Sequence, residues 1–214
     1  MCDSTVYLFV QKNREDISSE QKIRKIVPQY IKICEPRADS LLTVADEPLL
    51  IHRTSRGKPF LPQFPDLHLS VSHSGEWFVC AIGRKPVGID LQEHTLLRGE
   101  TQEQALIRYY KIARRFFHPL EADYVEADPK NRFFPVWTAK ESYVKYTGQG
   151  MDEYYDSFCI LDRSSGAPQL PTETPWQAEQ VSFLQIPFAD GYTFCICTPD
   201  SCNCRWVYLE DSLI

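Results

Sequence analysis

Three short runs of alternating apolar and polar residues follow one another between residues 67 and 92. In the first run, Leu67, Leu69 and Val71 alternate with polar side chains. The sequences HSGE and GRKP separate the runs, and both are rich in residues that favour turns. Because successive side chains of a strand point to opposite faces, this pattern predicts three consecutive strands, each with one apolar face.

Elsewhere the spacing of apolar residues changes between helical and strand-like periods. Residues 17–34 and 100–117 predict helices, and a third helix is expected to begin near Phe134 and to end at the glycines of TGQG. Residues 4–10 and much of the C-terminal third predict further strands. The mixture indicates an α+β protein. The less regular stretches predict a short helix at 37–45, a strand at 48–53 and a loop at 166–176.

Composition narrows the class of protein. With 43% hydrophobic residues, a chain of 214 residues can bury a substantial core. The net charge of −6 disfavours nucleic acid as a partner bound over a broad basic surface. No apolar run reaches the length of a membrane span, and the opening MCDSTVYLFV does not have the pattern of a signal peptide. We therefore expect a cytoplasmic protein with neither a nucleic-acid nor a membrane partner.

Four of the eight cysteines lie together in CICTPDSCNC, residues 195–204. Their spacing approximates some four-thiolate zinc sites, although such sites more commonly use C-x-x-C pairs. The overlapping sequence YTFCICT has the pattern of a strand, in which Cys195 and Cys197 would be small core side chains. We favour this second interpretation and expect reduced thiols.

The third predicted strand, VGIDLQEH at residues 87–94, carries an acid among apolar residues. Strand alternation places Asp90 on one face with Gly88 and Gln92 and turns Glu93 to the other. Gly88 would leave room for a ligand beside Asp90. If this carboxylate is buried, it requires a cation as its partner.

A second acid stands on the third predicted helix. Glu141 and Lys145 are four residues apart and therefore share one face with Trp137, one turn earlier. Such a pair is commonly a surface ion pair. If Glu141 and Asp90 instead converge, their natural shared partner is Mg²⁺ or Mn²⁺, completed by water and a phosphate group. Lys140 and Lys145 could then neutralise the remaining phosphate oxygens.

Two further stretches could bind an anion. In SVSHSGEW, Ser72 and His73 precede a turn whose backbone amides can point at a ligand. In RGKP, Lys58 lies beside Pro59, which fixes the backbone. Taken alone, each stretch is more commonly an ordinary polar turn.

Five segments resemble, in order along the chain, the 4'-phosphopantetheinyl transferases of the type that activates surfactin synthetase: RGKPFLP, HLSVSHSGEWFVCAI, VGIDLQ, ARRFFHPLEA and FFPVWTAKESYVKYTGQG. The resemblance spans residues 56 to about 160, and WTAKESYVK is similar to the family's W-x-x-K-E-[SA]-x-x-K motif. Each segment is moderately specific, whereas their ordered combination is highly specific. The resemblance implies Mg²⁺-dependent transfer of the phosphopantetheine arm of coenzyme A to a serine of an acyl or peptidyl carrier protein, with release of 3',5'-ADP.

The resemblance also implies a fold. The family is α+β, with a pseudo-twofold pair of similar halves, each a small antiparallel sheet packed on a long helix, and coenzyme A between them. For this chain it implies an N-terminal half, residues 1–88, with coenzyme A phosphate contacts, and a C-terminal half, residues 89–214, with the metal site. We expect a monomer.

Site roles follow from the same resemblance. Asp90, Glu141 and Gln92 match the metal ligands, although Gln92 stands where many members have a third carboxylate, so its amide or a water would replace that ligand. Lys145 matches the lysine that neutralises the pyrophosphate, and Glu141, or a metal-bound water that it orients, could also take the proton of the attacking serine. Glu121 matches an acid near the metal. The residues expected to contact coenzyme A are Lys58, Pro59, Ser72, His73, which would meet the ribose 3'-phosphate, and Lys140, with one of Arg37, Arg53 or Arg56.

Two other functions remain open at this level. A metal-dependent nuclease would also combine acids with lysines, but it would need a basic substrate groove, which the net charge disfavours. A non-catalytic module that binds coenzyme A or a carrier protein would be expected to have lost metal or phosphate positions, and Gln92 is the one visible departure. The basic stretch KIARRFF, which contains Arg114 and Arg115, could face the acidic helix of a carrier.

Overall fold

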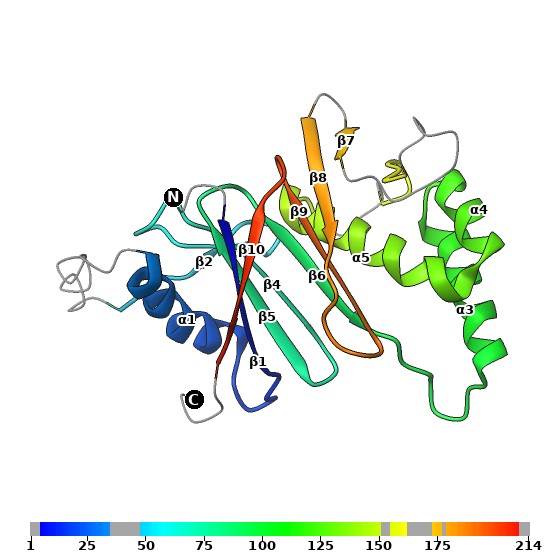
Figure 1. Cartoon of the computed structure of the whole chain (residues 1–214), viewed down its shortest axis with the longest axis horizontal. Helices are drawn as coiled ribbons and strands as arrows, with labels where there is room; N and C mark the ends of the chain where they lie inside the picture. Colours follow the sequence, from blue (N-terminus) through cyan, green and yellow to red (C-terminus); the bar gives the residue numbers. More distant parts are fainter. Residues whose placement is uncertain (1–4, 35–47, 151–154, 162–172, 177–178, 210–214) are drawn as a thin grey trace.

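The computed structural model describes residues 5–34, 48–150, 155–161, 173–176 and 179–209. Two four-stranded sheets lie between helix α1 (Ser19–Cys34) and helix α5 (Pro129–Thr147) (Figure 1). The expected mixture of helices and small sheets is therefore confirmed. None of the described helices is both long enough and apolar enough to span a membrane.

The first sheet has the strand order β10-β1-β5-β4. Strand β1 pairs in parallel with β10 and antiparallel with β5, so the last strand of the described chain joins the first. Tyr7 and Phe9 of β1 pack with Ile23 and Ile26 of α1, which covers this face of the sheet. The four strands are β1 (Thr5–Lys12), β4 (His68–Ser74), β5 (Trp77–Gly83) and β10 (Asn203–Tyr208).

The second sheet has the antiparallel order β6-β9-β8-β7. Helix α5 packs across it, and two further helices, α3 (Gln102–Phe116) and α4 (Pro119–Ala127), pack against α5. A short hairpin of β2 (His52–Arg53) and β3 (Pro59–Phe60) pairs with neither of these sheets, although β3 contacts β4. The strands of the second sheet are β6 (Gly88–Glu93), β7 (Glu173–Trp176), β8 (Glu179–Gln185) and β9 (Tyr192–Thr198).

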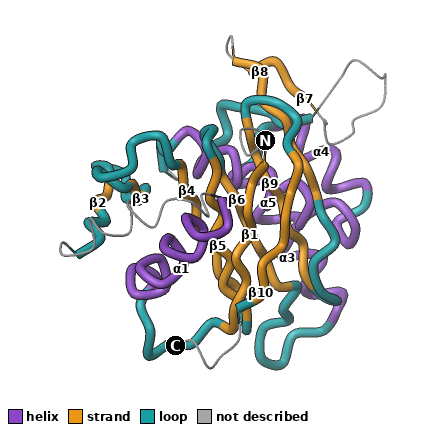
Figure 2. Tube along the Cα trace, turned by 60° about the vertical axis from the view of Figure 1, so that its left-hand side comes forward, coloured by secondary structure: helices purple, strands orange, loops and turns teal. Residues whose placement is uncertain are grey.

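An apolar layer joins the two sheets. Val6 and Leu8 of the first sheet belong to one buried cluster with Ile89 and Phe194 of the second. Figure 2 shows the sheets side by side, with α1 on one side and α5 on the other. Because Ile89 faces this layer, strand alternation turns its neighbour Asp90 toward α5. The fold thereby places an acid under a helix.

Three serines of β4 connect the adjacent edges of the sheets. The hydroxyl oxygens of Ser70, Ser72 and Ser74 each accept a hydrogen bond from a backbone N–H of β6, at 3.1, 3.0 and 2.9 Å. These hydroxyls satisfy an edge of β6 that pairs with no strand among the described residues. The polar face of the first predicted strand therefore has a structural function as well as a position near Asp90.

Gly88 makes room for a helix rather than for a ligand, which corrects the expectation from the sequence. A Cβ atom at this position would overlap the carbonyl oxygen of Ser142 and the backbone nitrogen of Tyr146, both in α5. Glycine thus lets α5 approach β6 closely. This close approach places the helix side chains next to Asp90.

Several element boundaries differ from those predicted. Helix α5 begins at Pro129 rather than near Phe134, because the side chain of Asp128 accepts a hydrogen bond from the N–H of Asn131 and Pro129 occupies the first turn. Gly148 ends the helix as predicted, with a φ of 73°. Helix α4 was not predicted. Of the less regular stretches, 37–45 lies outside the described residues, only 52–53 of 48–53 is a strand, and 173–176 forms β7 instead of a loop.

Candidate active site

Asp90 and Lys145 form the centre of the site. The Lys145 amine lies 2.7 Å from Oδ1 of Asp90 and also donates to the Ser72 hydroxyl oxygen at 3.1 Å. The Ser72 hydroxyl in turn donates to the same Asp90 oxygen at 2.9 Å. Asp90 is 5% exposed. The contact joins a strand of the second sheet, the edge of the first sheet and helix α5 at one point.

Two buried carboxylate oxygens at this point have no hydrogen-bond partner among the described residues: Oδ2 of Asp90 and Oε1 of Glu141. The two acids are close enough to interact, since burial and then the charge of Asp90 raise the pKa of Glu141 to about 7, while the Lys145 amine opposes the rise. Burial also raises the pKa of Asp90, against the lowering effect of Lys145. The single positive charge of Lys145 therefore compensates only part of the negative charge that the two acids carry when both are ionised.

This donor set fits a hard divalent cation. Unpartnered buried carboxylate oxygens are the ligands that Mg²⁺ prefers, and Mg²⁺ commonly takes one or two carboxylates with water and substrate phosphate. Within the described ranges, no group of three or more His, Cys, Asp or Glu residues is placed to hold a metal ion. Gln92 lies on the Asp90 face and is half-buried, with its amide nitrogen 3.4 Å from the carbonyl oxygen of Glu93. The two acids are therefore the ligands that the chain itself offers.

Tyr155 is a site residue that the sequence did not indicate. Its side chain is 7% exposed, and its hydroxyl has no hydrogen-bond partner among the described residues. The hydroxyl lies close to the Glu141 carboxylate, because burial and then the charge of Glu141 raise its pKa. Its ring packs against Trp137, with centroids 6.3 Å apart. No spacing rule connects Tyr155 to Glu141, since a loop follows α5.

Lys140 does not face this site, contrary to the expectation that it contacts phosphate. The side chain is fully buried, and its amine pairs with Glu121 of α4 at 2.8 Å and donates to the Phe158 carbonyl oxygen at 2.7 Å. Glu121 is also fully buried and accepts hydrogen bonds from the N–H groups of His118 and Ile160 at 3.0 and 2.6 Å. This ion pair fixes α4 and the segment containing Tyr155 against α5.

A basic cavity of about 170 Å³ lies beside the Asp90 cluster. Lys145 belongs to both, because it is one of the residues that line the cavity and its amine contacts Asp90. Of the three arginines left open by the sequence, Arg53 and Arg56 line the cavity, and Arg37 lies outside the described residues. No Asp or Glu is among the described residues that form its wall. The cavity therefore offers positive charge to an anionic ligand.

Lys58 and Pro59 also line this cavity. The Lys58 amine donates to the carbonyl oxygen of Tyr146, in the last turn of α5, at 2.7 Å. Burial lowers its pKa to about 8. The amine thus interacts favourably with the negative end of the helix and would gain from a phosphate nearby. His73 is exposed, and strand alternation turns it to the face of β4 opposite Ser72.

The site brings together a partly compensated acid pair, a lysine that contacts one acid and a cavity with basic walls. This combination of acids, a lysine and basic cavity walls suits a substrate that carries several phosphates together with a bound divalent cation. Glu93 takes no part, because its Oε1 accepts a hydrogen bond from the Tyr192 hydroxyl at 3.0 Å on the other side of the strand.

Comparison with known proteins assigns the chain to a family of phosphate-group transferases, which agrees with the chemistry of the site. A sequence model of the 4'-phosphopantetheinyl transferase superfamily matches residues 86–197. The chain is 32% identical over 196 residues to the 4'-phosphopantetheinyl transferase gsp of Aneurinibacillus migulanus. These residues cover 90% of this chain and 71% of that protein. It is 33% identical over 154 residues to a 4'-phosphopantetheinyl transferase of Bacillus subtilis, covering 69% of this chain and 62% of that protein.

A third relative, the 4'-phosphopantetheinyl transferase Sfp of Bacillus subtilis strain 168, is 32% identical over 145 residues, which cover 66% of this chain and 59% of that protein. The chain therefore spans less than two thirds of the length of both Bacillus subtilis relatives.

Proposed function

Because the chain belongs to the 4'-phosphopantetheinyl transferase superfamily, we propose that it transfers the phosphopantetheine arm of coenzyme A to a serine hydroxyl of an acyl or peptidyl carrier protein, releasing 3',5'-ADP. The observation that carries this proposal is the pair of buried, unpartnered oxygens on Asp90 and Glu141, beside Lys145 and the basic cavity. A bound Mg²⁺ would supply positive charge on the pyrophosphate.

Each residue of the site has a part in this proposal. Asp90 and Glu141 would hold the cation through the oxygens that have no hydrogen-bond partner among the described residues, and Gln92 or a water would be a third ligand. Lys145 neutralises charge that develops on the pyrophosphate as the phosphorus–oxygen bond to 3',5'-ADP breaks. Glu141 receives the proton that the serine hydroxyl releases as its oxygen bonds to phosphorus. The Tyr155 hydroxyl, which lies close to the Glu141 carboxylate, would orient it by donating a hydrogen bond.

The basic cavity is the proposed coenzyme A phosphate site. Lys58, Arg53 and Arg56 contribute its positive charge, and Pro59 fixes the hairpin that carries them. Ser72 adjoins the cavity through its hydrogen bonds with Lys145 and Asp90, and its hydroxyl would be a further contact. His73 is exposed and therefore accessible to the ribose 3'-phosphate. Lys140 is excluded from this set, since its amine is enclosed with Glu121.

The layered arrangement supports the finer expectation about the fold. We propose that α1 with the first sheet and α5 with the second form the pseudo-twofold pair of halves, residues 1–88 and 89–214. Strand β10 lies outside this division, because it comes from the second half and completes the first sheet. The monomeric state and the cytoplasmic location stay predictions.

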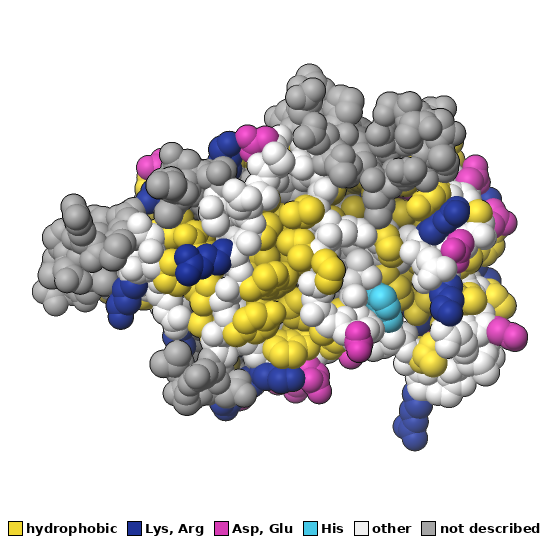
Figure 3. Space-filling view, in the orientation of Figure 1, with side chains coloured by type: hydrophobic (Ala, Val, Ile, Leu, Met, Phe, Trp, Pro, Cys, Tyr) yellow, Lys and Arg dark blue, Asp and Glu magenta, His cyan; other side chains and the backbone are white. Residues whose placement is uncertain are grey.

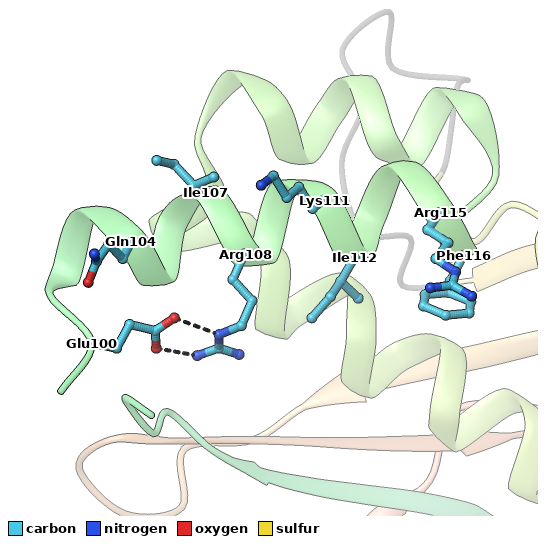
Figure 4. Close-up of a pocket in the computed structure, with 8 residues that line it drawn as sticks. All are labelled: Glu100, Gln104, Ile107, Arg108, Lys111, Ile112, Arg115 and Phe116. Atoms are coloured by element: carbon cyan, nitrogen blue, oxygen red, sulfur yellow. Dashed lines mark hydrogen bonds and ion pairs between the residues drawn. The ribbon is translucent and has the colours of Figure 1, made fainter. Parts of the chain in front are cut away.

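Helix α3 supports a docking place for the carrier protein. A surface hollow of about 490 Å³ runs along it, lined by residues that Figure 4 labels. Ile107 and Phe116 are 54% and 42% exposed there, and Lys111 and Arg115 add positive charge on successive turns. Arg108 is already occupied by both Glu100 carboxylate oxygens, each at 2.9 Å.

We propose that an acidic carrier helix lies along this hollow, with its apolar side chains over Ile107 and Phe116. The earlier suggestion of Arg114 is less suitable, because that guanidinium pairs with Asp123 at 2.8 Å and with Glu126. Lys111 and Arg115 therefore replace Arg114 as the proposed carrier contacts.

The direct test combines the protein with coenzyme A, Mg²⁺ and several apo carrier proteins, and measures carrier mass. We expect a carrier to gain one phosphopantetheine at its serine, and the serine-to-alanine carrier to gain none. Coenzyme A binding without transfer to any apo carrier would favour the alternative, a non-catalytic coenzyme A or carrier-binding module. The Glu141→Gln variant serves as the inactive comparison: it preserves the shape of the side chain and removes one charge, so we expect it to transfer less phosphopantetheine than the unsubstituted protein.

A further inference from the structure

Two C-x-C pairs lie close together in the sequence but in different environments. Cys195 and Cys197 belong to β9 and are fully buried in the cluster beneath α5. Cys202 precedes β10, Cys204 lies within it, and both are half-buried at the edge of the cluster between the sheets. The four thiols therefore do not converge, and the four-thiolate zinc site considered from the sequence is wrong for these residues.

The thiols of the second pair touch. The sulfur atoms of Cys202 and Cys204 lie 3.8 Å apart. Hydrophobic side chains gather across the middle of the face shown in Figure 3, over β9 and β10, and Trp206 and Phe188 belong to the same partly buried set as the two cysteines. Their sulfurs are thus held together at a partly exposed edge.

Only one of the two cysteines belongs to the paired part of β10. Asn203 is the first residue of β10 that pairs with β1, so Cys202 lies just outside the ladder of hydrogen bonds. Closing the gap requires the sulfurs to approach to about 2 Å. A disulfide that encloses a single residue restricts the unfolded chain little and strains the folded one, so it is easily reduced.

We propose that Cys202 and Cys204 are a reversible oxidation site, which closes to an intrachain disulfide by exchange with a small disulfide such as oxidised glutathione. The Cys202 thiolate attacks one glutathione sulfur, forms a mixed disulfide and displaces one glutathione thiolate, which takes up a proton. Cys204 then loses its proton, attacks the Cys202 sulfur and displaces the second glutathione. Two protein thiols are oxidised, and one glutathione disulfide is reduced to two thiols.

The surroundings select Cys202 as the attacking thiol. A hydrogen bond from the Cys204 thiol, opposed by burial, lowers the pKa of Cys202 to about 7, and the same hydrogen bond raises the pKa of Cys204. Burial raises the pKa of Cys195 to about 12 and that of Cys197 well above its ordinary value. Since the thiolate is the reactive form, the first C-x-C pair is an internal control with the same spacing.

The test treats the folded full chain with oxidised glutathione, blocks remaining thiols with an alkylating reagent and locates the modifications by fragmentation mass spectrometry. We expect Cys202 and Cys204 to lose two hydrogens together and to escape alkylation, and dithiothreitol to restore both. Cys195 and Cys197 should become alkylated only after unfolding. A disulfide between the pair Cys195 and Cys197, or full alkylation of Cys202 and Cys204 after treatment, would overturn the proposal.

A variant separates the two steps. In Cys204→Ser the resolving thiol is missing, so we expect Cys202 to accumulate as a stable mixed disulfide with glutathione. In the unsubstituted chain this adduct should be short-lived. A stable glutathione adduct on Cys202 in the unsubstituted chain, with Cys204 still reduced, would contradict the proposal, because the second exchange would then not occur.

Discussion

The amine of Lys145 lies 2.7 Å from one carboxylate oxygen of Asp90, while the other oxygen of that carboxylate is buried and accepts no hydrogen bond from the part of the chain that the structure describes. The lysine thus holds Asp90 from one side and leaves its second oxygen available. Glu141, one turn earlier on the same helix, presents a second oxygen of this kind. Charge compensation at this point is incomplete until a further cation binds.

Replacing Lys145 tests its part in transfer. We expect Lys145→Met to lower the kcat/KM of transfer by about 100-fold or more, because one preorganised charge is removed from the reacting phosphates. Lys145→Arg keeps the charge with a different shape and should retain intermediate activity. Circular dichroism checks that both variants fold. Transfer by folded Lys145→Met within about twofold of the unsubstituted enzyme would remove Lys145 from this role.

The effect of metal on stability should depend on pH. The pKa of Glu141 is raised from 4.5 to about 7 in the folded protein, so between these values the folded state holds a proton that the unfolded state has released. The contribution of Glu141 to stability of the metal-free protein therefore falls as pH rises through this range. Asp90, whose pKa is also raised, acts in the same direction.

Because Mn²⁺ competes with that proton, its stabilising shift in melting temperature should be larger at about pH 8 than at about pH 6. Thermal unfolding with Mn²⁺ and with EDTA measures the shift. Glu141→Gln should reduce the difference between the two pH values. An equal or larger shift at the lower pH would be inconsistent with metal binding at these acids.

Tyr155→Phe removes a single hydroxyl beside Glu141. Since that hydroxyl has no hydrogen-bond partner among the described residues, the free energy of unfolding should change by less than about 1 kcal/mol. The rate of transfer should fall by roughly tenfold, and its pH profile should move to higher pH, because a donor near the carboxylate is lost. Tyr109→Phe, in the same aromatic cluster, is the control. Unchanged kinetics in Tyr155→Phe would leave this tyrosine a packing residue.

Carrier docking on α3 can be tested by charge reversal. The double variant Lys111→Glu and Arg115→Glu should raise the KM for the carrier by about tenfold or more and leave the KM for coenzyme A unchanged. Lys25→Glu reverses one charge at an exposed position on α1, which belongs to another part of the fold than α3, and therefore provides a control. Equal carrier KM values for the double variant and the control would exclude this docking surface.

Local pattern predicted the face on which Asp90 lies, because a strand alternates with a period of two whatever its partners are. It could not predict the position of Lys140, which immediately precedes Glu141 and points about 100° away from it around the helix axis. That rotation turns the amine to Glu121, and the pairing depends on α4, which the sequence had not indicated. The sequence likewise assigned the Ser72 hydroxyl to a ligand and gave no sign of its hydrogen bonds to β6 and Asp90, because these are long-range.

The start of α5 had a local signal that was missed. Asp128 followed by Pro129 is a combination typical of a helix N-terminus. Tyr155 had no such signal, because only the fold of the segment after α5 brings it to Glu141.

The account depends most on the two unpartnered carboxylate oxygens, and the affinity of the protein for Mn²⁺ in the presence of coenzyme A measures their function directly. Glu141→Gln removes one charge without breaking a hydrogen bond at Oε1, and Glu93→Gln, on the opposite face of β6, is its control. We predict that Glu141→Gln weakens Mn²⁺ binding by at least about tenfold while Glu93→Gln does not. Equal affinity in the unsubstituted protein and in folded Glu141→Gln would contradict the proposed metal site.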